Sequence, residues 1–109
     1  MSITFNKKND IGYLLVDDEM TIYTAAEQKN ELLGHLSDCH EIELDLSHVT
    51  EIDSAGLQIL MVLKSEGIRL KREVRFTQHS QSVVEIFEML KLTTRFADPI
   101  VIPSEWQSS

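Results

Sequence analysis

Hydrophobic and acidic residues alternate without a break from Glu41 to Leu46, and Ile42, Leu44 and Leu46 occupy every second position. A period of two places such side chains on one face of a β-strand. The segment therefore predicts a half-buried strand. Other apolar runs predict four more strands: Ile3–Phe5, Ile11–Val16, Val74–Thr77 and Ile100–Ile102.

The first two of these strands flank the polar turn Lys7–Asp10, so we expect them to pair as a hairpin. Pro99 and Pro103 bracket the last strand, which is typical of a short edge strand.

Apolar residues recur at helical spacing in three segments, which predict the helices Thr24–Leu36, Ser54–Ser65 and Ser80–Leu90. The first helix is expected to place Ala25, Leu32, Leu33 and Leu36 on one side, and the third Val83, Phe87 and Leu90. The second helix is apolar from Leu57 to Leu63, which predicts burial on much of its circumference. Gly67 is its expected C-cap.

Strands and helices alternate after the hairpin, and this order implies βαβ crossovers. The chain has 109 residues, of which 42% are hydrophobic, which suits one domain with a packed core. We therefore expect a single α/β domain over residues 1–109, with residues 104–109 as a loose tail. Its mixed sheet of four to five strands starts with the hairpin and packs against three to four helices.

The formal net charge of −8 argues against nucleic acid and against an anionic membrane surface as partners. It favours a protein partner with a basic docking patch. A lone Cys39 cannot form an internal disulfide, and the chain shows neither a signal peptide nor a run long enough to span a membrane. These features predict a cytoplasmic protein without membrane insertion.

Ser54 follows Asp53 at the point where the second helix is expected to begin. Unpaired backbone N–H groups and the positive end of the helix dipole suit a serine that accepts a phosphate there, and equally a serine that caps the helix. If Asp53 is the N-cap, Ser54 takes the first helical position and turns its hydroxyl toward solvent. Gly56 costs roughly 1 kcal/mol within a helix, which indicates close approach of another backbone or a tight internal contact.

Other chemistry finds little support in the sequence. The four histidines lack the spacing of metal ligands, and no Gly-x-Ser-x-Gly motif surrounds Ser54. No glycine-rich nucleotide fingerprint appears, so we expect no enzyme activity, metal or cofactor. A basic stretch follows the second helix and is interpreted as a solvated surface; it consists of Lys64, Arg69, Lys71 and Arg72.

The run Ile42–Ser47, then Val49, then Ile52–Leu57 resembles the signature of STAS domains. Within that group it is similar to bacterial anti-sigma factor antagonists, whose partner switching controls transcription, stress responses included. The resemblance covers nearly the whole chain in length and element order, and its specific part is Asp53–Gly56.

In that family, the serine of the motif is phosphorylated by a partner protein that is both kinase and anti-sigma factor. The unphosphorylated antagonist binds this partner and frees the sigma factor, and a separate phosphoserine phosphatase reverses the modification. The resemblance therefore implies that Ser54 is the phosphoacceptor of a phosphoprotein. The expected docking rim around it consists of Thr50, Glu51, Asp53, Ala55, Gly56 and Gln58.

Asp17 and Asp18 are further candidates for this site. The family often has a Gly-x-Leu-Asp-like stretch after the second strand, and Thr21 stands here in place of its acidic residue. The sequence leaves open whether Asp17 or Asp18 approaches Ser54. The chain also resembles other stand-alone STAS domains, which imply an alternative function. In this alternative the chain is an accessory subunit of a membrane transporter and binds its cytoplasmic ATPase constitutively.

Overall fold

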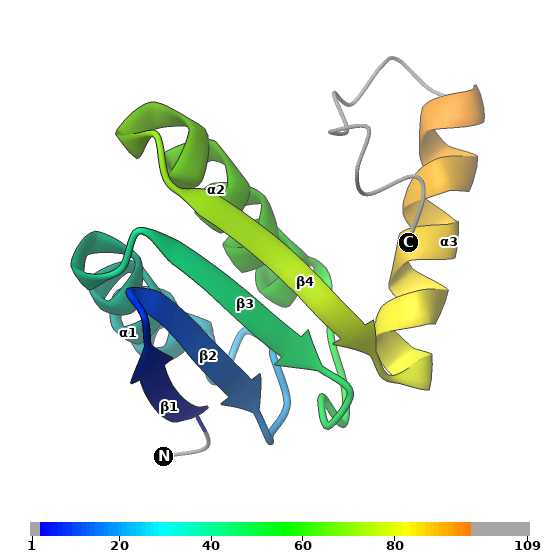
Figure 1. The fold of residues 1–109 in the computed structure, drawn as a ribbon. Helices are drawn as coiled ribbons and strands as arrows, with labels where there is room; N and C mark the ends of the chain where they lie inside the picture. Colours follow the sequence, from blue (N-terminus) through cyan, green and yellow to red (C-terminus); the bar gives the residue numbers. More distant parts are fainter. Residues whose placement is uncertain (1–2, 97–109) are drawn as a thin grey trace.

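Four strands form one mixed sheet in the order β1-β2-β3-β4 (Figure 1). The computed structural model describes residues 3–96, with side chains as far as residue 89. Its elements are β1 (Ile3–Lys8), β2 (Ile11–Val16), α1 (Ala25–Asp38), β3 (Glu41–Leu46), α2 (Ser54–Leu70), β4 (Glu73–His79) and α3 (Gln81–Phe96). Helices α1 and α2 pack side by side on the sheet, and α3 stands beside β4. The predicted α/β fold is confirmed, with four strands and three helices in the described part of the chain.

The predicted hairpin is confirmed, but its turn is shorter than expected. Strands β1 and β2 pair antiparallel from Ile3 opposite Val16 to Lys8 opposite Ile11. Only Asn9 and Asp10 form the turn, and both have positive φ angles, 54° and 63°. Two left-handed residues match the twist of a tight hairpin, so Lys7 and Lys8 stay in the strand.

The core lies between the sheet and the helices α1 and α2, and α3 adds Val83 and Phe87 to it. The alternation in β3 holds: Ile42, Leu44 and Leu46 are completely buried. Strand β3 pairs with β2 on one side and with β4 on the other, both in parallel orientation. Its apolar face therefore lies in the middle of the sheet. In α1, Leu32 and Leu36 are buried as predicted, whereas Ala25 and Leu33 are only half-buried.

Helix α2 extends to Leu70, five residues beyond the predicted Ser65. Gly67 is not its C-cap, because that role belongs to Lys71, which has a left-handed conformation (φ 58°, ψ 42°). Gly67 lies buried within the helix against β4, where a Cβ atom would stand 2.7 Å from Cγ2 of Val74. Packing against the sheet, and not helix termination, therefore requires the small residue.

The remaining boundaries differ by a few residues. Helix α1 begins at Ala25, with Thr24 in the N-cap position, and runs to Asp38. Helix α3 contains the predicted buried residues Val83 and Phe87 and continues to Phe96. The side chain of Leu90, the predicted strand 100–102 and the predicted tail 104–109 lie outside the described part.

Candidate functional site at the start of helix α2

Asp53 joins the start of α2 to the loop between β2 and α1. Its Oδ1 atom accepts hydrogen bonds from the backbone N–H groups of Ala55 (2.9 Å) and Gly56 (3.1 Å), so Asp53 is the N-cap, as predicted. Its Oδ2 atom accepts from the backbone N–H of Ile22 at 3.0 Å. Burial of this carboxyl opposes ionisation, but the donated hydrogen bonds outweigh it and hold the pKa of Asp53 below its usual value.

Gly56 allows the backbone of Met20 to cross the first turn of α2. A Cβ atom at Gly56 would lie 2.0 Å from the carbonyl oxygen of Met20, well inside contact distance. The same oxygen accepts a hydrogen bond from Asp53 N (3.3 Å), while Met20 N donates to Glu51 O (2.8 Å). Of the two reasons for a glycine here, the tight internal contact is therefore the correct one, and it is made with the backbone of Met20.

The loop of residues 17–24, called the Met20 loop below, is also held from within. Gln28 on α1 is 3% exposed, and its Nε2 atom donates to the carbonyl of Glu19 at 2.8 Å. The Thr24 hydroxyl donates to the same carbonyl at 3.0 Å. Thr21 is buried, and its carbonyl accepts from Ala25 N at 2.8 Å. Side chains and backbone together give this loop a defined conformation.

Ser54 is the first residue of α2, and it is exposed. Among the side chains that the structure describes, its hydroxyl makes no hydrogen bond, and the cap of the helix is supplied by Asp53. The expectation that this hydroxyl faces solvent is met. Ser54 thus stabilises no neighbouring group through its hydroxyl.

The residues predicted for the docking rim differ in their access to solvent. Thr50, Glu51 and Gln58 are exposed around Ser54, whereas Asp53 and Ala55 are half-buried. The remaining member, Gly56, is buried beneath Met20. A partner that contacts Ser54 therefore has access to the side chains of Thr50, Glu51 and Gln58, but not to Gly56.

The acidic candidates lie in the first part of the Met20 loop. The backbone carbonyl of Asp18 accepts from Thr50 N (3.2 Å), and its carboxylate accepts from Glu19 N (2.7 Å). Asp17 is exposed. Within the described residues neither carboxylate bonds to Ser54, and the loop residues that contact its neighbour Asp53 are Met20 and Ile22.

Sequence reasoning missed two residues of the same loop. Ile22 and Tyr23 are 72% and 90% exposed, among the most exposed large hydrophobic side chains in the described part. A signal exists in the sequence, since the pair stands between Thr21 and Thr24 and precedes the helical spacing of α1.

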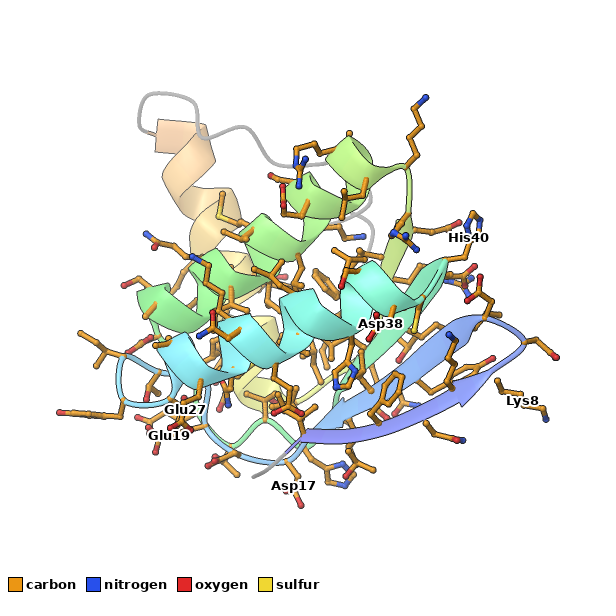
Figure 2. All side chains as sticks on the ribbon, turned by 90° about the vertical axis from the view of Figure 1, so that its left-hand side faces the viewer. Lys8, Asp17, Glu19, Glu27, Asp38 and His40 are labelled. Atoms are coloured by element: carbon orange, nitrogen blue, oxygen red, sulfur yellow. The ribbon has the colours of Figure 1, made fainter. Side chains whose placement is uncertain are left out.

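Charge is unevenly distributed between the two ends of the molecule. Figure 2 shows Asp17, Glu19 and Glu27 near the end that carries the Met20 loop, and Lys8, Asp38 and His40 toward the other end. Of these labelled residues, the ones at the end with the Met20 loop are all acidic, whereas those at the other end are mixed.

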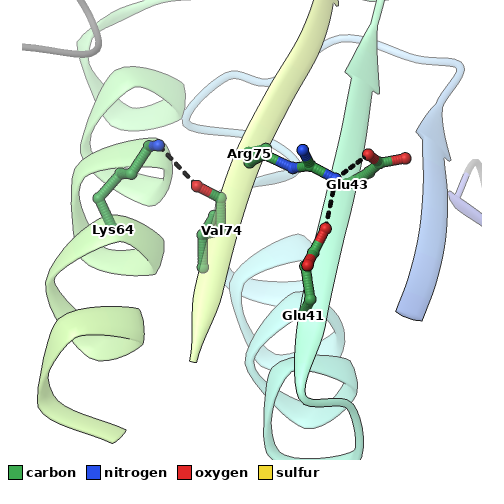
Figure 3. A network of polar contacts seen from close by, with 5 residues as sticks. All are labelled: Glu41, Glu43, Lys64, Val74 and Arg75. Atoms are coloured by element: carbon green, nitrogen blue, oxygen red, sulfur yellow. Dashed lines mark hydrogen bonds and ion pairs between the residues drawn. The ribbon is translucent and has the colours of Figure 1, made fainter. Parts of the chain in front are cut away.

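The other end holds an open cavity of about 550 Å³. Its lining is mainly basic and consists of His40, Lys64, Ile68, Lys71, Arg72, Glu73, Val74 and Arg75. Lys64 was expected in a solvated stretch, but it is 7% exposed and donates to the carbonyl of Val74 at 2.6 Å (Figure 3). Arg75 binds Glu41 and Glu43, also in Figure 3, and Arg72 donates to the carbonyl of Cys39 at 2.5 Å. These cations are engaged by protein groups.

Residues 3–96 contain no group of three side chains arranged to bind a metal ion. None of the described helices is long and apolar enough to cross a membrane.

Comparison with known proteins gives a family and a fold. Residues 3–102 match the family model "Mlab, STAS domain", and no curated protein matches the chain. A candidate anti-sigma factor antagonist from Thermotoga maritima is 19% identical, with a TM-score of 0.70 over 97% of this chain and 92% of its own. The anti-sigma factor antagonist SpoIIAA in its unphosphorylated form is 10% identical, with a TM-score of 0.68 over 91% and 88%.

The murine solute carrier 26 family member A9 anion transporter contains the same fold. Its structure is 17% identical, with a TM-score of 0.60, over 76% of this chain and 14% of the transporter. The family model covers most of the chain, including the segment Asp53–Gly56 and all the strands and helices that the structure describes. This chain therefore belongs to the STAS domain family.

Proposed function

We propose that this chain is an anti-sigma factor antagonist controlled by phosphorylation of Ser54. In the unphosphorylated state it binds an anti-sigma factor with serine kinase activity, and sigma factor is released. Phosphorylation of Ser54 ends this binding, and a phosphoserine phosphatase restores it. The chain acts in the cytoplasm by binding and catalyses no reaction itself. The observation that carries the proposal is the Ser54 hydroxyl, exposed at the start of α2 and unbonded within residues 3–96.

The fold comparisons support this role. Of the similar structures, SpoIIAA is an anti-sigma factor antagonist and the Thermotoga maritima protein is a candidate one. SpoIIAA is described in its unphosphorylated form, which implies a phosphorylated counterpart. Identities of 19% and 10% relate these proteins to the chain by fold. The site itself therefore carries the argument for Ser54.

The surroundings of Ser54 indicate how a phosphate would act. It would add about −1.5 to −2 charges beside Asp53 and Glu51. The helix dipole offers it roughly 0.3–1 kcal/mol, and the N–H groups of Ala55 and Gly56 are already bound to Asp53. We expect the fold to stay unchanged and the phosphate to oppose docking, where it would lose water without matched donors.

Asp53 is adjacent to Ser54 but suits a structural role. Its two carboxylate oxygens together accept three backbone hydrogen bonds, and its pKa is lowered, so it is a poor acceptor for the serine proton. The general base for phosphoryl transfer is therefore assigned to the kinase.

Intact-mass analysis of the chain purified from its own cells tests the modification. We expect a pool heavier by one phosphate that maps to Ser54 and disappears in Ser54→Ala. Incubation with fractionated cell extract and ATP then identifies the kinase, whose binding is measured by calorimetry. Ser54→Ala should bind like the wild type, and Ser54→Glu at least tenfold more weakly, which is about 1.4 kcal/mol. Equal binding of both variants would contradict the switch.

A second function is a constitutive accessory subunit that binds the cytoplasmic ATPase of a membrane transporter. The occurrence of this fold within a murine anion transporter favours it. This model predicts no phosphorylated pool in cells and no effect of Ser54→Glu on binding to the ATPase. The same mass analysis therefore separates the two functions.

A further inference from the structure

The Met20 loop presents an apolar pair that the fold does not use. Ile22 and Tyr23 are adjacent in sequence, and the two residues are 72% and 90% exposed to solvent. The residues on either side are anchored: Thr21 is buried, and the Thr24 hydroxyl binds the carbonyl of Glu19. The loop therefore has a fixed backbone and exposes two large apolar side chains to solvent.

This arrangement has the properties of a binding anchor. Aromatic residues are enriched among the residues that carry most of the energy of protein interfaces. A preorganised loop also loses little conformational entropy when a partner binds it. The hydrogen bonds of Gln28, Thr24 and Asp53 hold the Met20 loop before any partner arrives.

The pair belongs to the same surface as Ser54. The backbone N–H of Ile22 lies 3.0 Å from the carboxylate of Asp53, the residue that precedes Ser54 in the chain. A protein that covers Ile22 therefore also approaches the start of α2, where Ser54 lies. A phosphate there would lie at the edge of an apolar contact, where its desolvation is costly.

We propose that Ile22 and Tyr23 anchor the unphosphorylated chain in a pocket of its kinase partner, and that apolar side chains line this pocket with Lys or Arg at its border. This inference rests on the proposed function and names the recognition element of the same site. The basic border follows from charge complementarity, because Asp17, Asp18, Glu19 and Glu27 flank the pair along the chain, and all four are exposed or half-exposed. Glu51 is exposed as well, and its carbonyl accepts a hydrogen bond from Met20 N in the same loop.

Calorimetric titration of the full chain with the purified kinase that phosphorylates Ser54, in the absence of ATP, tests the proposal. The double variant Ile22→Ser/Tyr23→Ser should bind at least tenfold more weakly than the wild type. The matched control is Ile68→Ser, since Ile68 is 74% exposed near the other end of α2. The control should bind within twofold of the wild type, and thermal unfolding of all three proteins should coincide.

The outcomes separate the two levels of the argument. If the double variant binds like the wild type while Ser54→Glu binds weakly, the anchor is wrong and the proposed function stands. If the wild-type chain does not bind the kinase at all, both fail. Light scattering adds a third result: a dimer of the wild type that the double variant lacks would assign the pair to a second copy of this chain and overturn the proposal.

Discussion

The two ends of helix α2 are built in opposite ways. At its start, the side chain of Asp53 caps the helix and also holds the Met20 loop. At its end, the left-handed backbone of Lys71 terminates the helix, and nearby cations bind protein groups. The first end combines the exposed hydroxyl of Ser54 with the exposed apolar pair Ile22 and Tyr23, whereas the second end exposes Ile68 without such a hydroxyl beside it. Exposed apolar surface alone therefore does not distinguish the two ends; its combination with Ser54 does.

The glycines of α2 provide the largest test of this difference. Gly56→Ala would place a Cβ atom 2.0 Å from the Met20 carbonyl, and we expect it to lower the free energy of unfolding by about 3 kcal/mol. Gly67→Ala meets a Val74 methyl group at 2.7 Å, so a net loss of about 1 kcal/mol is expected after the gain in helix propensity. Urea denaturation measures both changes.

Gly34 in α1 is the matched control, because a Cβ atom there meets nothing within 4 Å. Gly34→Ala should raise stability by up to about 1 kcal/mol. Equal urea midpoints for Gly56→Ala and the wild type would mean that the crossing of Met20 does not require a glycine.

Removal of the shared cap should have the next largest effect. We expect Asp53→Ala to cost about 2 kcal/mol, because it leaves the N–H groups of Ile22, Ala55 and Gly56 without their acceptor. Amide exchange of these three residues should accelerate, with no change at the end of the helix. Asp17→Ala, at an exposed position in the same loop, should stay within about 0.5 kcal/mol of the wild type. Exchange that accelerates equally at both ends would contradict a local role.

At the other end, the left-handed conformation of Lys71 predicts a stabilising substitution. A non-glycine residue loses roughly 1–2 kcal/mol in this conformation, and glycine adopts it freely. Lys71→Gly should therefore raise the free energy of unfolding by about 1 kcal/mol. Lys29→Gly, at an exposed position inside α1, should lower it by a similar amount. Two variants of the same sign would show that the backbone angle at Lys71 is not decisive.

The pH dependence of Asp53 gives the smallest expected effect. Its pKa in the folded chain lies below the ordinary value, which is about 3.9 in an unfolded chain. Its ionised form therefore adds stability that is fully present above about pH 5 and is lost as the pH falls through the folded pKa. The stability difference between the wild type and Asp53→Asn should be constant from about pH 7 to 5 and shrink below about pH 4 in urea titrations. A difference that grows on acidification would contradict the lowered pKa.

Sequence patterns predicted the central elements well because burial and periodicity agree there. Strand β3 has its predicted bounds, and its three apolar residues are completely buried. The end of α2 was predicted wrongly because a glycine can serve packing as well as termination, and sequence alone does not separate the two at Gly67. The left-handed conformation of Lys71 cannot be predicted from its residue type, because lysine rarely adopts this conformation.

The candidate site was predictable in part for a similar reason. Asp53 and Ser54 occupy positions with known local chemistry, so their roles as cap and exposed hydroxyl followed from sequence order. The Met20 loop depends on hydrogen bonds between residues 31 apart, such as Ile22 and Asp53, which no local pattern encodes. The sequence position of Ile22 and Tyr23 is a weak signal by comparison, and their exposure follows from the conformation of the loop.

The Met20 loop separates what keeps its shape from what it displays. The loop conformation is maintained by Thr21 and Thr24 within the loop and by Gln28 of α1, whereas Ile22 and Tyr23 extend from the loop into solvent. Related chains in one cell could therefore diverge at these two outward positions and acquire separate binding preferences while retaining the same scaffold. Insulation of parallel signalling circuits would then require few substitutions and little loss of stability.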